Sequence, residues 1–211
     1  MQQWNAYLHL LTQASSYLHS HDLLLTVALH PGQYLPPEVC QSVDRVHLMT
    51  YDMTSQEEQT INHHASLRSV EDAISSFIQH GCPPSKLIMG IPAYARHSQN
   101  MGLVKTYSEI IDEFIAEQDS TTMIDESTID SMQNIWKGYP FDSPKDVDAK
   151  VEYAMQNGLG GVFFWELGQD KQLSGIAHGG ILLEKAAMVV AGRHSTHGGD
   201  HRNRKFVSQE L

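Results

Sequence analysis

The stretch VHLMTYDM, Val46 to Met53, begins as an apolar strand and ends in two polar side chains, Tyr51 and Asp52. Successive residues of a β-strand point to opposite faces of a sheet. One face therefore carries Val46, Leu48 and Thr50, and the other carries His47, Met49 and Tyr51. The first face suits packing against helices, and the second is expected to look into the centre of the fold. A phenol and a carboxylate need polar partners, so this strand end either reaches solvent or contributes to a site.

Strand and helix patterns alternate on both sides of this stretch. Apolar residues at helical spacing, with caps at Ser69 and Ser143, predict helices over 4–19, 37–42, 69–80, 107–117, 144–156 and 181–191. Apolar runs predict strands over 23–31, 44–52, 86–96 and 160–170. The first is expected to be buried on both faces, and the third is expected to run out at Pro92. This alternation predicts right-handed βαβ units and a parallel sheet of about four strands.

The number of strands limits the fold class. A closed (β/α) barrel has eight strands and typically about 250 residues. The prediction is therefore an α/β fold, a parallel (β/α) barrel of TIM type that is incomplete. One domain is expected over residues 1–191, and the polar tail over 192–211 is expected to be disordered.

The composition limits the partners. The 211 residues are 41% hydrophobic, which is enough for one sizeable core, and their formal net charge is −11. This acidity argues against nucleic acids and anionic membrane surfaces as partners, and it permits a neutral ligand such as a sugar. No apolar run is long enough to span a bilayer, and the opening MQQWNAYLHLL lacks the features of a signal peptide. Cys40 and Cys82 each precede a predicted strand, and we favour two free, partly buried thiols over a disulfide.

In parallel α/β folds the ligand site lies at the carboxyl ends of the strands. The residues that follow or end the predicted strands include His30, Tyr51, Asp52, Tyr94, Arg96, Trp165, Glu166 and Asp170. Alternation turns Glu166 away from the face of Trp165, so Glu166 is expected to face helices or a loop. Taken singly, Tyr51 and Trp165 are also compatible with core packing, but their joint position at strand ends favours a site.

Three segments carry a resemblance: LMTYD on one strand, GIPAYAR on the next, and GLGGVFFWELGQD on the last. Together they resemble the family 18 glycoside hydrolases, the chitinases and chitinase-like proteins. LLLTVALHP and KTYSEIIDEF also fit, and the resemblance covers roughly residues 4–191. It implies a TIM barrel of which this chain supplies about strands five to eight and a short insertion. It also implies chitin or N-acetylglucosamine oligosaccharides as ligand, no cofactor or metal, and an extracellular location.

The resemblance assigns roles where the residues match. Met49, Tyr51 and Asp52 match the family's M-x-Y-D strand, in which the Tyr bonds the sugar's acetamido group and the Asp lies near the acid. Tyr94 and Arg96 match residues that line the cleft, although Ala95 replaces the usual glycine between them. Trp165 matches the tryptophan that forms the floor under the sugar, and a flat indole is also a reasonable sugar platform in its own right.

The catalytic acid of the family is absent from this sequence. It ends a motif D-x-x-D-x-D-x-E, and the substrate's own acetamido oxygen makes the attack. The nearest match here is Asp146-Val147-Asp148, but Lys150 stands where the Glu is needed, on a predicted helix. The family's preceding S-x-G-G strand is absent too. No residue of this chain is therefore predicted to be the catalytic acid, and Tyr51 and Asp52 remain supporting residues.

Three functions stay open. The chain is part of a chitinase whose other half-barrel is supplied elsewhere or in trans, a chitin-binding lectin without activity, or a truncated product without function. His194, His197 and His201 have loose metal-ligand spacing, but a disordered tail is the preferred interpretation. His63 and His64 are interpreted as loop residues.

Overall fold

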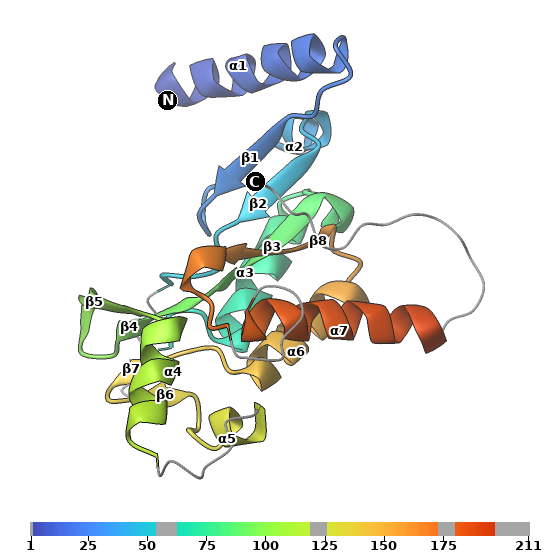
Figure 1. Ribbon diagram of the computed structural model, residues 1–211. Coiled ribbons are helices and arrows are strands. Elements are labelled where there is room, and N and C mark those ends of the chain that lie inside the picture. Colours follow the sequence, from blue (N-terminus) through green and yellow to red (C-terminus); the bar gives the residue numbers. More distant parts are fainter. Residues whose placement is uncertain (1, 54–62, 119–125, 173–179, 197–211) are drawn as a thin grey trace.

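The main sheet has four parallel strands (Figure 1). The computed structural model describes residues 2–53, 63–118, 126–172 and 180–196. In these residues the strand order is β1 (Thr26–Leu29), β2 (Arg45–Leu48), β3 (Leu87–Pro92) and β8 (Gly161–Trp165). Each neighbouring pair is parallel, which confirms the predicted arrangement.

Helices pack against this sheet and enclose the core. They are α1 (Gln2–His19), α2 (Pro37–Ser42), α3 (Leu67–Gln79), α6 (Pro144–Gln156) and α7 (Ile181–Thr196). The core joins strand residues such as Val46 and Leu48 to helix residues such as Ile74 and Val151, all of them almost fully buried. Helices α2 and α6 have the predicted bounds, since Pro37 and Pro144 each begin a helix without losing a hydrogen bond.

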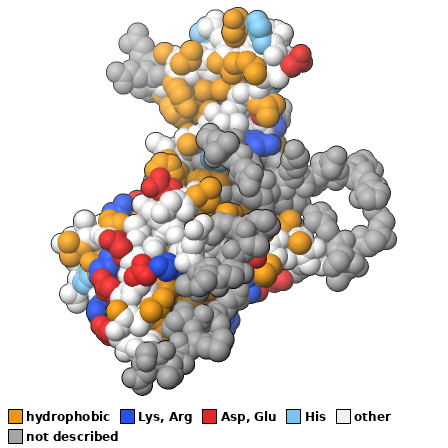
Figure 2. Space-filling view, viewed as in Figure 1, with side chains coloured by type: hydrophobic (Ala, Val, Ile, Leu, Met, Phe, Trp, Pro, Cys, Tyr) orange, Lys and Arg blue, Asp and Glu red, His pale blue; other side chains and the backbone are white. Residues whose placement is uncertain are grey.

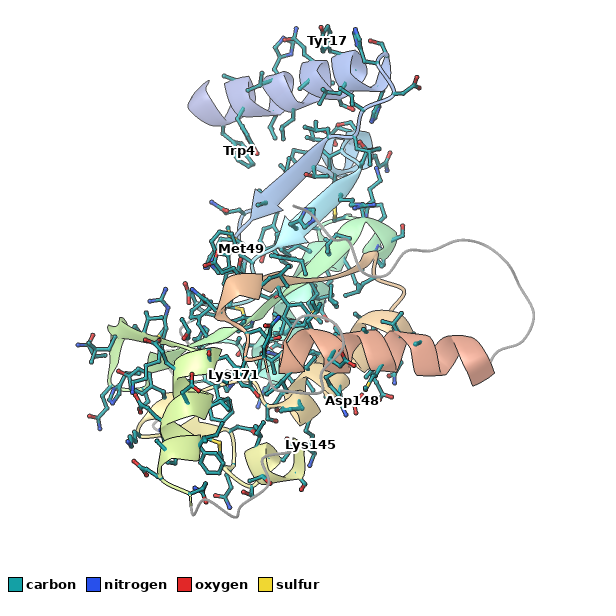
Figure 3. The ribbon with its side chains drawn as sticks, in the orientation of Figure 1. Trp4, Tyr17, Met49, Lys145, Asp148 and Lys171 are labelled. Carbon is teal, nitrogen blue, oxygen red and sulfur yellow. A yellow bond between two sulfur atoms is a disulfide. The ribbon has the colours of Figure 1, made fainter. Side chains whose placement is uncertain are left out.

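Helix α1 lies beyond the N-terminal ends of β1 and β2, opposite their arrowheads (Figure 1). Trp4 points from the side of α1 that faces the sheet, and Tyr17 points from the opposite side (Figure 3). Hydrophobic side chains gather between α1 and the strands in the space-filling view (Figure 2). The Ser15 hydroxyl donates to the carbonyl of Ser42 at 2.6 Å and ties α1 to α2.

Strand β1 is buried on one face only, so the prediction of burial on both faces is wrong. Val27 and Leu29 are buried against the helices, whereas Thr26 and Ala28 are exposed. The apolar run predicted the strand correctly. The apolar run alone did not indicate that the other face of this strand is exposed in the described structure.

The predicted strand over 86–96 ends at Pro92 as expected, and a separate strand that was not predicted follows after Ala93. The Ala93 amide donates to the Trp165 carbonyl at 2.8 Å, and the Ala93 carbonyl accepts from the Tyr107 amide at 2.9 Å. Beyond this point the chain enters an antiparallel hairpin and a small insertion. These elements are β4 (Tyr94–His97), β5 (Asn100–Thr106), α4 (Tyr107–Ala116), α5 (Glu126–Asp130), β6 (Ile135–Trp136) and β7 (Tyr139–Pro140).

Two predicted helix ends are also wrong. Helix α3 begins at Leu67, because Ser66, rather than Ser69, is the cap: its hydroxyl accepts from the Ser69 amide at 3.2 Å. Helix α7 continues past Gly192 to Thr196, so the polar tail does not begin at 192. The expectation of disorder for 197–211 lies outside the described residues.

Cys40 and Cys82 form a disulfide, so the expectation of free thiols is wrong. Cys40 lies in α2 and Cys82 follows α3, and the fold brings their Cα atoms to 5.6 Å. This separation lies within the usual range for a bridge. Sequence spacing alone did not predict the contact, because the two residues are 42 positions apart.

Lys150 lies on α6 and pairs with Asp142, which precedes the helix. Both side chains are 1% exposed, and the Lys150 ammonium donates to an Asp142 carboxylate oxygen. Asp146 completes a capping box with Ser143 at the start of α6. The segment that most resembled the acid motif is therefore a capped helix that contributes a buried ion pair.

Candidate functional site

Tyr51 lies on the open face of the sheet just beyond β2. Its ring packs edge-on against Tyr94 and Phe163, with centroids 6.1 and 6.3 Å away. Gly90 of β3 leaves room for this ring, because a β-carbon there would lie 2.8 Å from a Tyr51 ring carbon and 2.9 Å from Phe163. Burial, with the nearby Asp52 charge, raises the pKa of Tyr51 to about 12. The phenol is therefore protonated, and able to donate, across the neutral range.

Asp52 is the centre of a polar network. One carboxylate oxygen accepts from the Tyr94 hydroxyl at 2.7 Å and from Arg96 Nε at 2.5 Å. The other accepts from Arg96 Nη2 at 2.6 Å, so the guanidinium binds the carboxylate through two nitrogens. Burial alone would raise the pKa of Asp52, but the hydrogen bonds from Arg96 and Tyr94 hold this pKa well below its usual range. Asp52 is consequently an anion held in one orientation.

His64 belongs to this network, although the sequence was interpreted there only as a loop. Its side chain is fully buried, and Nδ1 accepts from the Asp52 amide at 3.1 Å. Nε2 lies 3.2 Å from the Tyr94 carbonyl. A His-His pair beside a polar strand end was the available signal, but only the fold places it against Asp52, 12 residues earlier in the chain.

Trp165 ends β8 with 53% of its surface exposed. It lies in the wall of a cavity of about 630 Å³ on the open face of the sheet, together with Ala28, His47, Tyr51 and Glu166. Glu166, expected to face helices or a loop, follows the end of β8 and also contributes to the lining of this cavity. The strand ends at Trp165, so alternation does not continue to Glu166, which precedes the short turn η2 (Leu167–Gln169).

A second cavity, of about 340 Å³, adjoins the first and shares Met49, Tyr51 and Trp165 with it. Its lining consists of Met49, Tyr51, Asp52, Tyr94, Arg96, Val104, Trp165 and Gln169. The fold thus brings all six residues of the predicted ligand site to one concave surface. Figure 3 places Met49 beside the end of β2.

Neighbouring charges fasten the end of β8 to the insertion and to the last helix. Lys171 donates to Asp112 of α4 at 2.5 Å. The Asp170 carboxylate accepts from the amides of Leu182 and Leu183 at 3.0 Å each, at the start of α7. These contacts hold in place the segment that follows Trp165.

Within the described part of the chain, no group of three or more His, Cys, Asp or Glu side chains is arranged to hold a metal ion. The side chain of His194, and all of His197 and His201, lie outside the described structure. Nor does any described helix combine the length and apolarity that crossing a membrane requires.

Comparison with known proteins gives consistent matches. A family model described as "Glycosyl hydrolases family 18" matches residues 2–170. Chitotriosidase-1 of Mus musculus is 27% identical over 191 residues, covering 70% of this chain and 40% of that protein. The structure of Ostrinia furnacalis Group IV chitinase is 26% identical with a TM-score of 0.65, covering 88% of this chain and 62% of that one.

The GH18 chitinase of Cycas revoluta, solved in complex with (GlcNAc)3, shares the fold. Its TM-score is 0.67 at 22% identity, over 90% of this chain and 64% of that chain. This chain thus spans about two fifths of the curated relative and less than two thirds of either solved structure.

Proposed function

Because this chain belongs to the glycosyl hydrolases of family 18, we propose that it binds N-acetylglucosamine polymers of the chitin type at the cavity beside Trp165. One observation carries the proposal: an exposed indole, a protonated phenol and an Arg-bound carboxylate line the same concave surface. Sugar recognition needs such a combination, because a pyranose ring has an apolar C–H face and a polar edge.

Each residue has a role in this proposal. Trp165 supplies the platform under the sugar ring, with Met49 beside it. Tyr51 donates a hydrogen bond to the acetamido oxygen, since its phenol is protonated at neutral pH. Asp52, held by Tyr94 and Arg96, faces the sugar hydroxyls as a fixed acceptor.

Trp165→Ala is expected to weaken binding of the N-acetylglucosamine trimer about 10- to 100-fold. The reason is the lost apolar contact area, worth about 1.5–3 kcal/mol for a large side chain. Titration calorimetry on the purified chain measures the Kd. Trp4→Ala is the matched control, because Trp4 is exposed on α1 and lines neither cavity. Equal affinities for wild type and Trp165→Ala would refute the platform role.

We further propose that the chain is an incomplete barrel, equivalent to about strands five to eight. The open face of the described sheet supports this, since exposed Thr26 and Ala28 and a 630 Å³ cavity lie where a closed barrel has further strands. In such a barrel the edge of β1 would pair with a complementary half supplied in trans. Retaining, substrate-assisted hydrolysis would then use an acid on that other half.

The chain alone is expected to bind chitotriose without hydrolysing it at a measurable rate. Without a general acid the leaving oxygen is not protonated, and acid–base help is typically worth about 10²- to 10⁴-fold. The test is release of a fluorescent leaving group from a chitotriose reporter. Turnover by wild type that Glu166→Gln abolishes would show that Glu166 is the acid and that this proposal is wrong.

Completion of the barrel offers a further comparison. With a complementary half-barrel that carries its own acid, Trp165→Ala should act mainly on substrate binding, while Tyr51→Phe should act mainly on turnover. Tyr51→Phe removes one hydrogen bond to the attacking acetamido group and leaves the ring contacts in place. Negligible effects of both substitutions would indicate that these side chains serve packing.

A further inference from the structure

His64 joins two backbone segments of the candidate site through one buried imidazole ring. On one side the ring meets the amide of Asp52, and on the other it meets the carbonyl of Tyr94. The ring is 0% exposed and packs against the Tyr94 ring, with centroids 5.0 Å apart. It therefore connects the end of β2 to the start of β4, the two segments that carry the carboxylate and the phenol.

The two contacts define the tautomer of His64. A backbone amide can only donate, so Nδ1 must accept from Asp52 and carries no proton. A backbone carbonyl can only accept, so Nε2 must carry the proton that it donates to Tyr94. Both partners require the same neutral Nε2–H form, in which each ring nitrogen has a hydrogen-bond partner. The Nδ1–Asp52 Oδ1 approach of 3.3 Å is then a close contact without a hydrogen.

Such support bears on the backbone of Asp52, which is left-handed, with a φ of 57°. Residues other than glycine adopt this region infrequently, although Asp and Asn tolerate it better than other side chains do. His64 holds the turn from both sides: its ring accepts from the Asp52 amide, and its carbonyl accepts from the Met53 amide at 2.9 Å. The direction of the Asp52 carboxylate, and with it the Arg96 and Tyr94 contacts, depends on this turn.

Neighbouring side chains also pack against the His64 ring. His63 stacks on it with centroids 5.8 Å apart and planes 12° apart. His63 Nε2 lies 3.4 Å from the Asp142 carboxylate, which pairs with Lys150. Burial lowers the pKa of His63. A buried chain of polar groups thus supports His64 without exposing it to solvent.

We propose that His64 is a positioning residue for sugar binding: as the neutral Nε2–H tautomer, it holds Asp52 in its left-handed conformation and aligns it with Tyr94. This inference rests on the proposed function, because an effect on affinity requires that a sugar contacts the side of the cavity lined by Asp52. The backbone contacts themselves can be tested without any sugar.

Two variants separate the ring contacts. His64→Phe keeps a ring of similar size and removes both hydrogen bonds. His64→Asn places an amide oxygen where Nδ1 stands, so it keeps an acceptor for the Asp52 amide and loses the contact to Tyr94. We expect His64→Phe to weaken binding of the N-acetylglucosamine trimer about tenfold, equivalent to roughly 1.4 kcal/mol, and His64→Asn to restore most of it. His80→Asn, at the exposed end of α3, is the control and should leave the Kd unchanged.

Nuclear magnetic resonance of the wild-type chain provides the sugar-free measurement. The ¹⁵N signals of the His64 ring should report Nε2–H and a bare Nδ1, and the Asp52 amide should exchange slowly with solvent. An Nδ1–H tautomer, or rapid exchange of the Asp52 amide, would overturn the proposal even if His64→Phe does not fold. Wild-type affinity in His64→Phe, or failure of His64→Asn to improve on it, would overturn it equally. If wild type binds no trimer, the proposed function fails, while the ring signals and amide exchange still decide the role of His64 at Asp52.

Discussion

Replacing Lys150 alone by methionine is expected to lower the free energy of unfolding by about 3–5 kcal/mol. The Lys150 ammonium is the closest charged partner of the Asp142 carboxylate, and both side chains are 1% exposed. Methionine fills much of the same volume but leaves the carboxylate buried, with His63 Nε2 at 3.4 Å and the like charge of Asp146 nearby. An uncompensated buried charge is far more costly than a missing surface ion pair.

Urea unfolding followed by circular dichroism measures this loss. The double variant Asp142→Leu/Lys150→Met is the control, because it removes both charges and leaves neither buried alone. It should recover much of the stability, as apolar replacements of whole buried pairs often do. A loss below about 1 kcal/mol in Lys150→Met would mean that water or another group compensates Asp142 in the folded protein.

The double substitution Cys40→Ala/Cys82→Ala is expected to lower the free energy of unfolding by about 4 kcal/mol at most. The disulfide closes a loop across a sequence separation of 42. Removing that constraint lets the unfolded chain gain conformational entropy, and a loop of this length corresponds to about 4 kcal/mol. Alanine is the appropriate replacement, because both cysteines are buried and serine would bury unpaired hydroxyls.

The matched comparison is wild type unfolded in urea with and without a reductant. Reduced wild type should unfold at a lower urea concentration than oxidised wild type, close to the double variant. Coincident curves for the oxidised and reduced protein would contradict the assignment of a stabilising bridge. Because Lys150 and the disulfide lie in different contacts, their effects should be approximately additive.

Local patterns were sufficient where nearby residues determine an element. Ser143 and Pro144 define the start of α6 through a cap and a proline at the first turn, and the helix lies where the sequence predicts it. Strand β8 is likewise a continuous apolar run between a turn and a polar segment. The parallel order of the sheet followed from the alternation of such elements.

Contacts between distant residues determine what the sequence did not show. The contact of the Ala93 amide with the Trp165 carbonyl joins residues 72 positions apart, and the disulfide depends on how α2 and α3 pack. Strand alternation gave no reliable direction for Glu166, because β8 ends one residue earlier, at Trp165. His64 was treated as a loop residue because its partners, Asp52 and Tyr94, become neighbours only in the fold.

The candidate site shows the same division. Strand ends and the family resemblance selected six residues that the fold gathers around one cavity. In the supporting layer behind them, His64 contacts the Asp52 backbone and His63 contacts Asp142, and the adjacent histidines alone did not indicate either partner. Side chains of this kind are recognised only by their burial and by the atoms they meet.

The position of the Cys40–Cys82 bridge has a consequence for the order of events during synthesis. Both cysteines precede β3, so the segment from Cys40 to Cys82, which contains β2 and α3, can be covalently closed before β8 and α7 have been translated. Chains fold from the N-terminal side as they are made, and disulfides persist in oxidising compartments such as the endoplasmic reticulum. Synthesis in a reducing cytosol would leave that first segment without its covalent closure while the later strands are still emerging.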